Sequence, residues 1–238
     1  MKLDLLAFGA HADDVELSCS GTLLKQISLG KKAGIIDLTR GELGTRGTPA
    51  IREREAQNAA QIMGIDIREN LGMRDGFFVN DEVHQLQVIR MIRKYQPEII
   101  LANAIHDRHP DHGRAAQLIE DSSFLSGLRM IETVEEDIQQ DPWRPRVIYH
   151  YIQDEWIEPD LVVDISVFLE KKLEAIRAFQ SQFFDPKSRE PETYISRPDF
   201  IDSLIFRAQE SGKMIGAKYG EGFTSRRKTG VDNLFHLK

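Results

Sequence analysis

Short apolar runs alternate with amphipathic segments along most of the chain. The apolar runs predict buried strands at Leu3–Phe8, Gly34–Leu38, Ile65–Arg68, Ile99–Ala102, Val147–Ile152 and Leu161–Ile165. Apolar residues that recur every three or four positions predict helices over 52–63, 82–95, 113–125, 167–180 and 200–217. Because strands and helices alternate, the pattern favours right-handed crossovers and a mostly parallel sheet. We therefore expect an α/β, Rossmann-like three-layer fold whose active site lies at the C-terminal ends of the strands.

One polar segment interrupts this alternation. Residues 184–199 hold three prolines among many polar residues, which is typical of a long loop that is functional or mobile. A linker between two domains would look similar, but too little chain follows it to form a second core. The chain is therefore expected to form a single domain over 1–238.

Composition narrows the classes of protein that fit. Of the 238 residues, 41% are hydrophobic and 29% are charged, as in ordinary globular proteins. The net charge of −7 argues against a nucleic-acid partner, and an anionic substrate would need local arginines. Cys19 is the single cysteine, so no internal disulfide can form, which suits a reducing, cytoplasmic compartment. No signal peptide is expected, because Asp4 interrupts the first apolar stretch, and no run is long enough to predict a membrane span.

Two clusters of histidine and aspartate follow two of the predicted strands. The first is FGAHADDVE at 8–16, and the second is HDRHPDH at 106–112. In an open parallel sheet, ligands bind beyond the carboxyl ends of the strands. If both strands are central, their loops meet at one crevice, which would gather His11, Asp13, Asp14, His109, Asp111 and His112.

Histidine and aspartate are ligands that suit a zinc ion. His11 and Asp14 are three positions apart, so they would share one face of a helix that started at Asp13. His112 could supply a third ligand from the second cluster. Three protein ligands and a water are the pattern of a catalytic zinc, which lowers the pKa of its water toward ~7.

The remaining residues of the clusters have roles that such a site would need. Asp13, beside Asp14, could accept the proton of the water. His109 could stabilise an oxyanion or protonate a leaving amine, and Asp111 could hold its imidazole in the charged form. Each cluster alone has a simpler interpretation, because Asp13 could cap a helix and Pro110 could open one.

The two clusters together resemble the paired signature of the LmbE/PIG-L-like zinc deacetylases. AHADDVE at 10–16 matches the usual A-H-P-D-D-x-E, with Ala12 in place of proline, and HPDH at 109–112 matches the second motif. Further matches run through nearly the whole chain, at LTRGELGTRGT (38–48), Arg52 and Glu55, MRD (73–75), SQF (181–183) and GEGF (220–223). Within the family, the sequence is most similar to the bacterial N-acetylglucosaminyl-malate deacetylases of bacillithiol biosynthesis.

The resemblance implies a role for each residue of the clusters. The zinc ligands of the family fall on His11, Asp14 and His112, with one zinc per chain, its general base falls on Asp13, and its histidine–aspartate pair falls on His109 and Asp111. Its sugar contacts match Arg52 and Asp75, and the family also implies a possible homo-oligomer. By their chemistry, Arg46 and Arg108 are further candidates, because a guanidinium can bind a malate carboxylate.

The expected reaction is hydrolysis of the N-acetyl group of N-acetylglucosaminyl-L-malate to acetate and a free amine. Another N-acetylglucosamine conjugate or N-acetyl sugar is the alternative substrate. A metallophosphoesterase would need more ligands than the two clusters offer. A non-catalytic binding module would not need Asp13 beside a ligand, and the first loop lacks the GxGxxG phosphate cradle.

Overall fold

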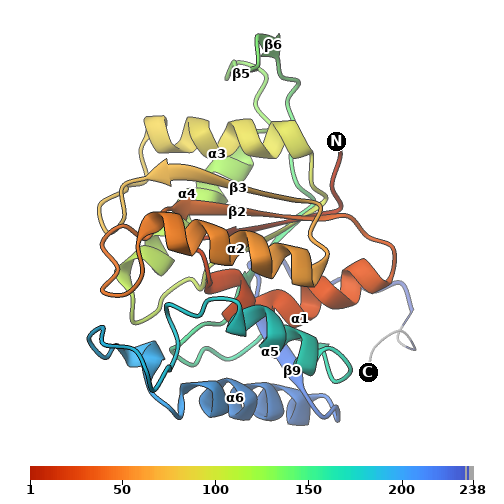
Figure 1. The fold of residues 1–238 in the computed structure, drawn as a ribbon. Coiled ribbons are helices and arrows are strands. Elements are labelled where there is room, and N and C mark those ends of the chain that lie inside the picture. Colours follow the sequence, from red (N-terminus) through yellow and green to blue (C-terminus); the bar gives the residue numbers. More distant parts are fainter. Residues whose placement is uncertain (234, 236–238) are drawn as a thin grey trace.

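The computed structural model describes residues 1–233 and 235, and a seven-stranded sheet lies at its centre (Figure 1). The strand order is β3-β2-β1-β4-β7-β9-β8, and β1 to β4 and β7 run parallel. β9 runs antiparallel to both of its neighbours, β7 and β8. The strands are β1 (Leu5–Gly9), β2 (Ala33–Thr39), β3 (Ile67–Met73), β4 (Ile99–Ala102), β7 (Val147–Tyr151), β8 (Leu161–Asp164) and β9 (Gly220–Thr224). The predicted mostly parallel sheet is confirmed.

Helices cover both faces of this sheet and complete three layers (Figure 1). On one face lie α3 (Glu82–Tyr95) and α4 (Pro110–Leu125), which bury Val88, Ile92 and Leu118 against the strands. On the other face lie α1 (Asp14–Ser28), α2 (Pro49–Met63) and α5 (Leu169–Arg177), and α6 (Phe200–Met214) packs against β8 and β9 beside α5. Burial of apolar side chains on both faces explains why β1 and β2 are buried along their whole length.

Several elements differ from their predicted bounds. Helix α4 begins at Pro110 rather than at 113, because His109 caps it and proline suits the first helical position. Strand β3 continues to Met73, five residues past the predicted end at Arg68. Strand β9 was not predicted, because GEGFT lacks an alternating apolar pattern. A small hairpin of β5 (Val134–Glu135) and β6 (Ile138–Gln139) projects from the α3 side of the molecule (Figure 1).

The long polar segment contains one 3-10 helix, Tyr194–Ser196, and its residues 193–195 line a cleft at the carboxyl ends of the strands. Among the described residues, no helix combines the length and apolar character that crossing a membrane requires.

Candidate active site

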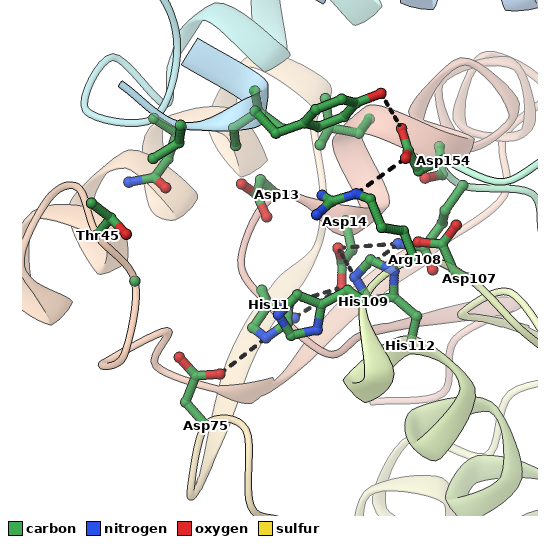
Figure 2. A pocket seen from close by; sticks show the side chains of 18 of the residues that line it. His11, Asp13, Asp14, Thr45, Asp75, Asp107, Arg108, His109, His112 and Asp154 are labelled. Atoms are coloured by element: carbon green, nitrogen blue, oxygen red, sulfur yellow. Dashed lines mark hydrogen bonds and ion pairs between the residues drawn. The ribbon is translucent and has the colours of Figure 1, made fainter. Parts of the chain in front are cut away.

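The two predicted clusters meet in a cleft of about 540 Å³ (Figure 2). They meet because β1 and β4 are adjacent in the sheet, so the loops after these strands leave the sheet side by side. The imidazole of His11 lies 4.7 Å from that of His109 and 5.8 Å from that of His112, measured between ring centroids. The two motifs were expected to meet because each follows a strand of a parallel sheet, and the structure brings them together in this way.

The turn between β1 and α1 directs two aspartates differently. The turn is tight, and a Cβ on Gly9 would lie only 2.9 Å from the carbonyl oxygen of His11. Helix α1 starts at Asp14, and His11 lies before it. The prediction that His11 and Asp14 share one face of a helix is therefore wrong. The side chain of Asp13 makes no capping hydrogen bond, which removes the helix-cap interpretation. Its carboxylate instead lies 3.6 Å from the Arg52 guanidinium and lines the cleft.

Asp14 lies at the centre of the cluster. Its Oδ2 accepts hydrogen bonds from the backbone N–H of His11 at 2.9 Å and from Asn103 Nδ2 at 3.0 Å. Its Oδ1 lies 3.1 Å from His112 Nε2 and 3.2 Å from Gln153 Nε2. Burial alone would raise the pKa of Asp14, but the charges of His112 and His11 and the hydrogen bonds from these two residues hold it far below its usual range.

His11 has carboxylates on both sides of its ring. Its Nδ1 lies 3.7 Å from Asp14, and its Nε2 lies 3.1 Å from Asp75 and 3.4 Å from Asp111. Burial lowers the pKa of His11, but the hydrogen bonds to Asp111 and Asp75 outweigh it and raise the pKa to about 10. The ring is therefore held by Asp75 and Asp111 with its Nδ1 toward Asp14.

His112 is held in the same way by a residue that sequence reasoning missed. Its Nδ1 lies 2.6 Å from Asp107, while its Nε2 faces Asp14. Burial lowers the pKa of His112, but Asp14 and Asp107 together raise it to about 9. Asp107 lies in the DRHPDH stretch, five positions before His112, but no ligand spacing pointed to it.

The donor set fits a divalent cation. Two groups have all their donor atoms within 4.8 Å of one another: His11, His109 and His112, and His11, Asp75 and Asp111. Asp14 is in neither group, but it lies between His11 Nδ1 and His112 Nε2 and joins them. In both histidines a carboxylate holds the opposite ring nitrogen, which is the usual support of a metal-ligating histidine. His11, Asp14 and His112 thus suit zinc by donor type and by support.

The expected ion pair between Asp111 and His109 differs from the observed contacts. The Asp111 carboxylate contacts His11, accepts from the Gly76 N–H at 2.8 Å and pairs with Arg114 at 2.6 Å. His109 Nδ1 instead accepts the backbone N–H of Asp111 at 3.3 Å, because His109 is the N-cap of α4. Burial and the neighbouring imidazoles lower the pKa of His109. The neutral ring therefore carries its proton on Nε2.

The four candidate substrate residues all line the cleft or its wall, but they have partners in the protein. Arg52 donates to the carbonyl of Gly41 at 3.3 Å and pairs with Asp13. Asp75 accepts from the N–H of Leu43 at 3.0 Å in addition to its contact with His11.

The guanidinium groups of Arg46 and Arg108 already have partners within the protein, so neither is a free site for an anion. Arg46 donates to the carbonyls of Ser181 and Phe183, and its side chain is buried. Arg108 pairs with Asp154 at 3.2 Å (Figure 2). It also stacks on the Tyr194 ring, 4.5 Å from its centroid. Of the two, Arg108 is half exposed and remains open to the cleft.

Comparison with known proteins agrees with this site. The family model of the GlcNAc-PI de-N-acetylases, PIG-L, matches residues 6–123. The solved structure of a conserved protein from Thermus thermophilus is 33% identical, covers 98% of each chain and has a TM-score of 0.86. Diacetylchitobiose deacetylase of Thermococcus kodakarensis is 27% identical over 228 residues, which are 92% of this chain and 81% of the relative. A probable N-acetyl-alpha-D-glucosaminyl L-malate deacetylase 2 of Bacillus anthracis is 25% identical over 187 residues, 73% of this chain and 78% of the relative.

A three-layer α/β fold with this His–Asp cluster and these relatives defines a hydrolase that acts on amides. The chain belongs to the PIG-L/LmbE family of N-deacetylases, which confirms the resemblance of its two motifs.

Proposed function

We propose that this protein is a zinc-dependent deacetylase that hydrolyses the N-acetyl group of an N-acetylglucosamine conjugate. The observation that carries the proposal is that Asp13 lines the same cleft as three residues that fit a cation, His11, Asp14 and His112. The diacetylchitobiose and glucosaminyl-malate deacetylases among the relatives support the substrate class. The reaction adds one water to the amide and releases acetate and the free amine.

In this proposal Asp13 is the base that activates the water. When bound, a zinc ion lowers the pKa of its water and polarises the acetyl carbonyl. Burial raises the pKa of the Asp13 carboxyl against the opposing effect of Arg52, which makes Asp13 a stronger base than an exposed aspartate. Asp13 takes the proton of the water and passes it to the nitrogen of the leaving amine.

We assign His109 the role of oxyanion donor. Its Nδ1 accepts a backbone N–H, so its Nε2–H is the donor of the neutral ring. A fixed donor beside the oxygen that gains charge stabilises the tetrahedral intermediate more than the substrate. The lowered pKa of His109 favours this role over protonation of the amine. In this arrangement Asp111 supports His11 rather than His109.

A more specific part of the proposal concerns the group that is attached to the N-acetylglucosamine. We propose the malate conjugate as the substrate, with Arg108 and Arg52, two cations that line the cleft, as the groups that would bind its carboxylates. Arg46 is a weaker candidate, because carbonyl oxygens of Ser181 and Phe183 already bind its guanidinium. Diacetylchitobiose is the neutral alternative, since it has no carboxylate to bind.

A substrate panel tests both levels of the proposal. The purified protein is assayed for free amine with N-acetylglucosaminyl-malate, diacetylchitobiose and N-acetylglucosamine. A preference for the malate conjugate supports the finer proposal, and equal rates on all three would leave only a general N-acetylglucosamine deacetylase. No amine from any of them would contradict the substrate class.

Metal analysis and one variant test the mechanism. Asp13→Ala should abolish turnover and leave the metal content unchanged, and activity at the level of the unchanged protein would show that Asp13 is not the base. One equivalent of zinc per chain is expected, whereas two would favour a metallophosphoesterase. A single domain, a cytoplasmic location and a homo-oligomer stay predictions of the sequence.

A further inference from the structure

Two neutral amide side chains, which sequence analysis did not single out, hold the carboxylate of Asp14. Asn103 directly follows β4, and Gln153 follows β7 by two residues. Both are buried, with Asn103 fully inaccessible and Gln153 5% exposed. Asn103 Nδ2 donates to Asp14 Oδ2 at 3.0 Å, and Gln153 Nε2 donates to Oδ1 at 3.2 Å. Each oxygen of Asp14 therefore receives one hydrogen bond from a side-chain amide.

The backbone determines which end of each amide faces Asp14. Asn103 Oδ1 accepts the N–H of Ala10 at 3.0 Å. Gln153 Oε1 accepts the N–H of Ala104 at 3.1 Å and Asn103 Nδ2 at 3.0 Å. Because the oxygen of each amide is already bound to a backbone donor, its NH₂ group must point toward Asp14. The network thus joins the ends of β1, β4 and β7.

Neutral donors suit a cation ligand better than charged ones. An amide orients a carboxylate without neutralising it, whereas a lysine or arginine would compete with the cation. Arg207 also lines the cleft, but its guanidinium donates to the backbone carbonyls of Gln153 and Asp154. It therefore fixes the segment that carries Gln153 and leaves the negative charge of Asp14 available.

We propose that Asn103 and Gln153 are positioning residues that fix the Asp14 carboxylate and thereby set the affinity of the site for its divalent cation. The proposal rests on the zinc site proposed above. Loss of the groups that orient a metal ligand typically costs about 10–100-fold in metal affinity. Gln153 also contacts His112, since its Nε2 lies 3.3 Å from His112 Nε2, so it touches two of the three proposed ligands.

The experiment measures the dissociation constant of zinc by competition with a chelator. Gln153→Met keeps the length of the side chain and removes its hydrogen bonds, and about 10–100-fold weaker zinc binding is expected. Gln182→Met is the matched control. Gln182 lines the same cleft and is also buried, but its Nε2 donates to the Arg46 carbonyl and to Ser181, away from the ligands. The control should change the zinc affinity by less than about 2-fold.

Gln153→Met also leaves the Ala104 N–H unpaired, so it could weaken zinc binding through a general loss of structure. Repeating the change in a protein that carries Asp14→Asn separates this effect from the loss of the hydrogen bond to Asp14. In Asp14→Asn, the same Gln153→Met change should have less than about a third of its effect on zinc affinity, because both changes act through one carboxylate. An equal loss in both backgrounds would overturn the proposal, as would unchanged affinity in Gln153→Met alone. If Asp14→Asn alone binds zinc normally, the zinc site itself fails.

Discussion

The floor and the rim of the cleft use charged residues in opposite ways. The floor consists of His11, Asp14 and His112, whose side chains face one another across the ends of neighbouring strands. The rim consists of Arg46 and Arg108, which bind backbone carbonyls or Asp154. Charge in the floor is concentrated where the proposed cation would bind, whereas charge in the rim ties segments of the protein together. The residue type alone therefore does not tell which charges serve a substrate.

The largest expected effect is on proton exchange in the floor. The pKa values of about 10 for His11 and about 9 for His112 mean that both rings are protonated at pH 7 before a cation binds. Zinc needs neutral imidazoles, so its binding releases these protons and its affinity rises with pH. The affinity should change by about two log units per pH unit below pH 9, or ~10⁴-fold between pH 6 and pH 8.

Chelator competition across this pH range measures the slope. Calorimetry in buffers of different ionisation enthalpy counts the released protons independently. A slope near zero would show that His11 and His112 do not exchange protons for the cation. The charges of the floor would then serve only contacts within the protein, as those of the rim do.

The next effect concerns catalysis above the floor. His109→Ala should lower kcat about 10²–10³-fold and leave zinc affinity nearly unchanged, because it removes the oxyanion donor but no proposed ligand. Steady-state kinetics and zinc titration measure the two quantities. His109→Ser is the control for folding, since serine also caps a helix and should preserve the stability of α4, whereas its short hydroxyl does not reach the position of the imidazole Nε2 and should not restore the rate. Full activity in His109→Ser would mean that capping, and not donation, is the role of His109.

The third prediction concerns Asp107, whose carboxylate holds the ring of His112 in the floor. Asp107→Ala should weaken zinc binding about 10–100-fold, because His112 loses the carboxylate at its Nδ1. The zinc dissociation constant measures this effect. Asp154→Ala is a matched change on the rim side, since Asp154 contacts Arg108 and Tyr194 rather than a ligand. Equal losses of zinc affinity in both variants would erase the distinction between floor and rim.

The floor was predictable from the sequence because its parts lie in two short motifs. Strand β1 ends directly before the first motif, and only residues 103–105 separate strand β4 from the second cluster at 106–112. The rule for parallel sheets places the loops after such strands together. The partners of the motifs were not predictable in this way. Asn103 and Gln153 reach Asp14 only because the strand order is β1-β4-β7, and local sequence patterns do not encode that order.

The rim could not be predicted because its contacts join distant segments. Arg46 binds the carbonyls of Ser181 and Phe183, about 135 positions further along the chain. Strand β9 was missed for a related reason, since Gly220 and Gly222 are buried by close packing against Val162 and Pro159 rather than by apolar side chains of their own. In both cases the tertiary neighbours, not the local pattern, determine the structure.

Arg46 should behave as a structural residue of the rim. Arg46→Ala leaves buried carbonyls without a donor and is expected to lower the free energy of unfolding by about 2 kcal/mol. Chemical denaturation measures this change. The ratio of kcat/KM for an anionic and a neutral conjugate should stay the same. A selective loss on the malate conjugate would instead assign Arg46 to the substrate.

The smallest effect is expected at Arg108, where the rim is open to solvent. Arg108→Ala removes a half-exposed guanidinium that pairs with Asp154 and stacks on Tyr194, so the free energy of unfolding should change by less than about 1 kcal/mol. If Arg108 binds a malate carboxylate, KM for the malate conjugate should rise about 3–10-fold, with no change for diacetylchitobiose. Because the guanidinium must leave Asp154 or share it to bind an anion, the gain from binding is reduced by the lost pair. Equal KM changes for both substrates would place Arg108 with Arg46 as a residue that holds the rim, and the preference for an anionic conjugate would then have to come from Arg52.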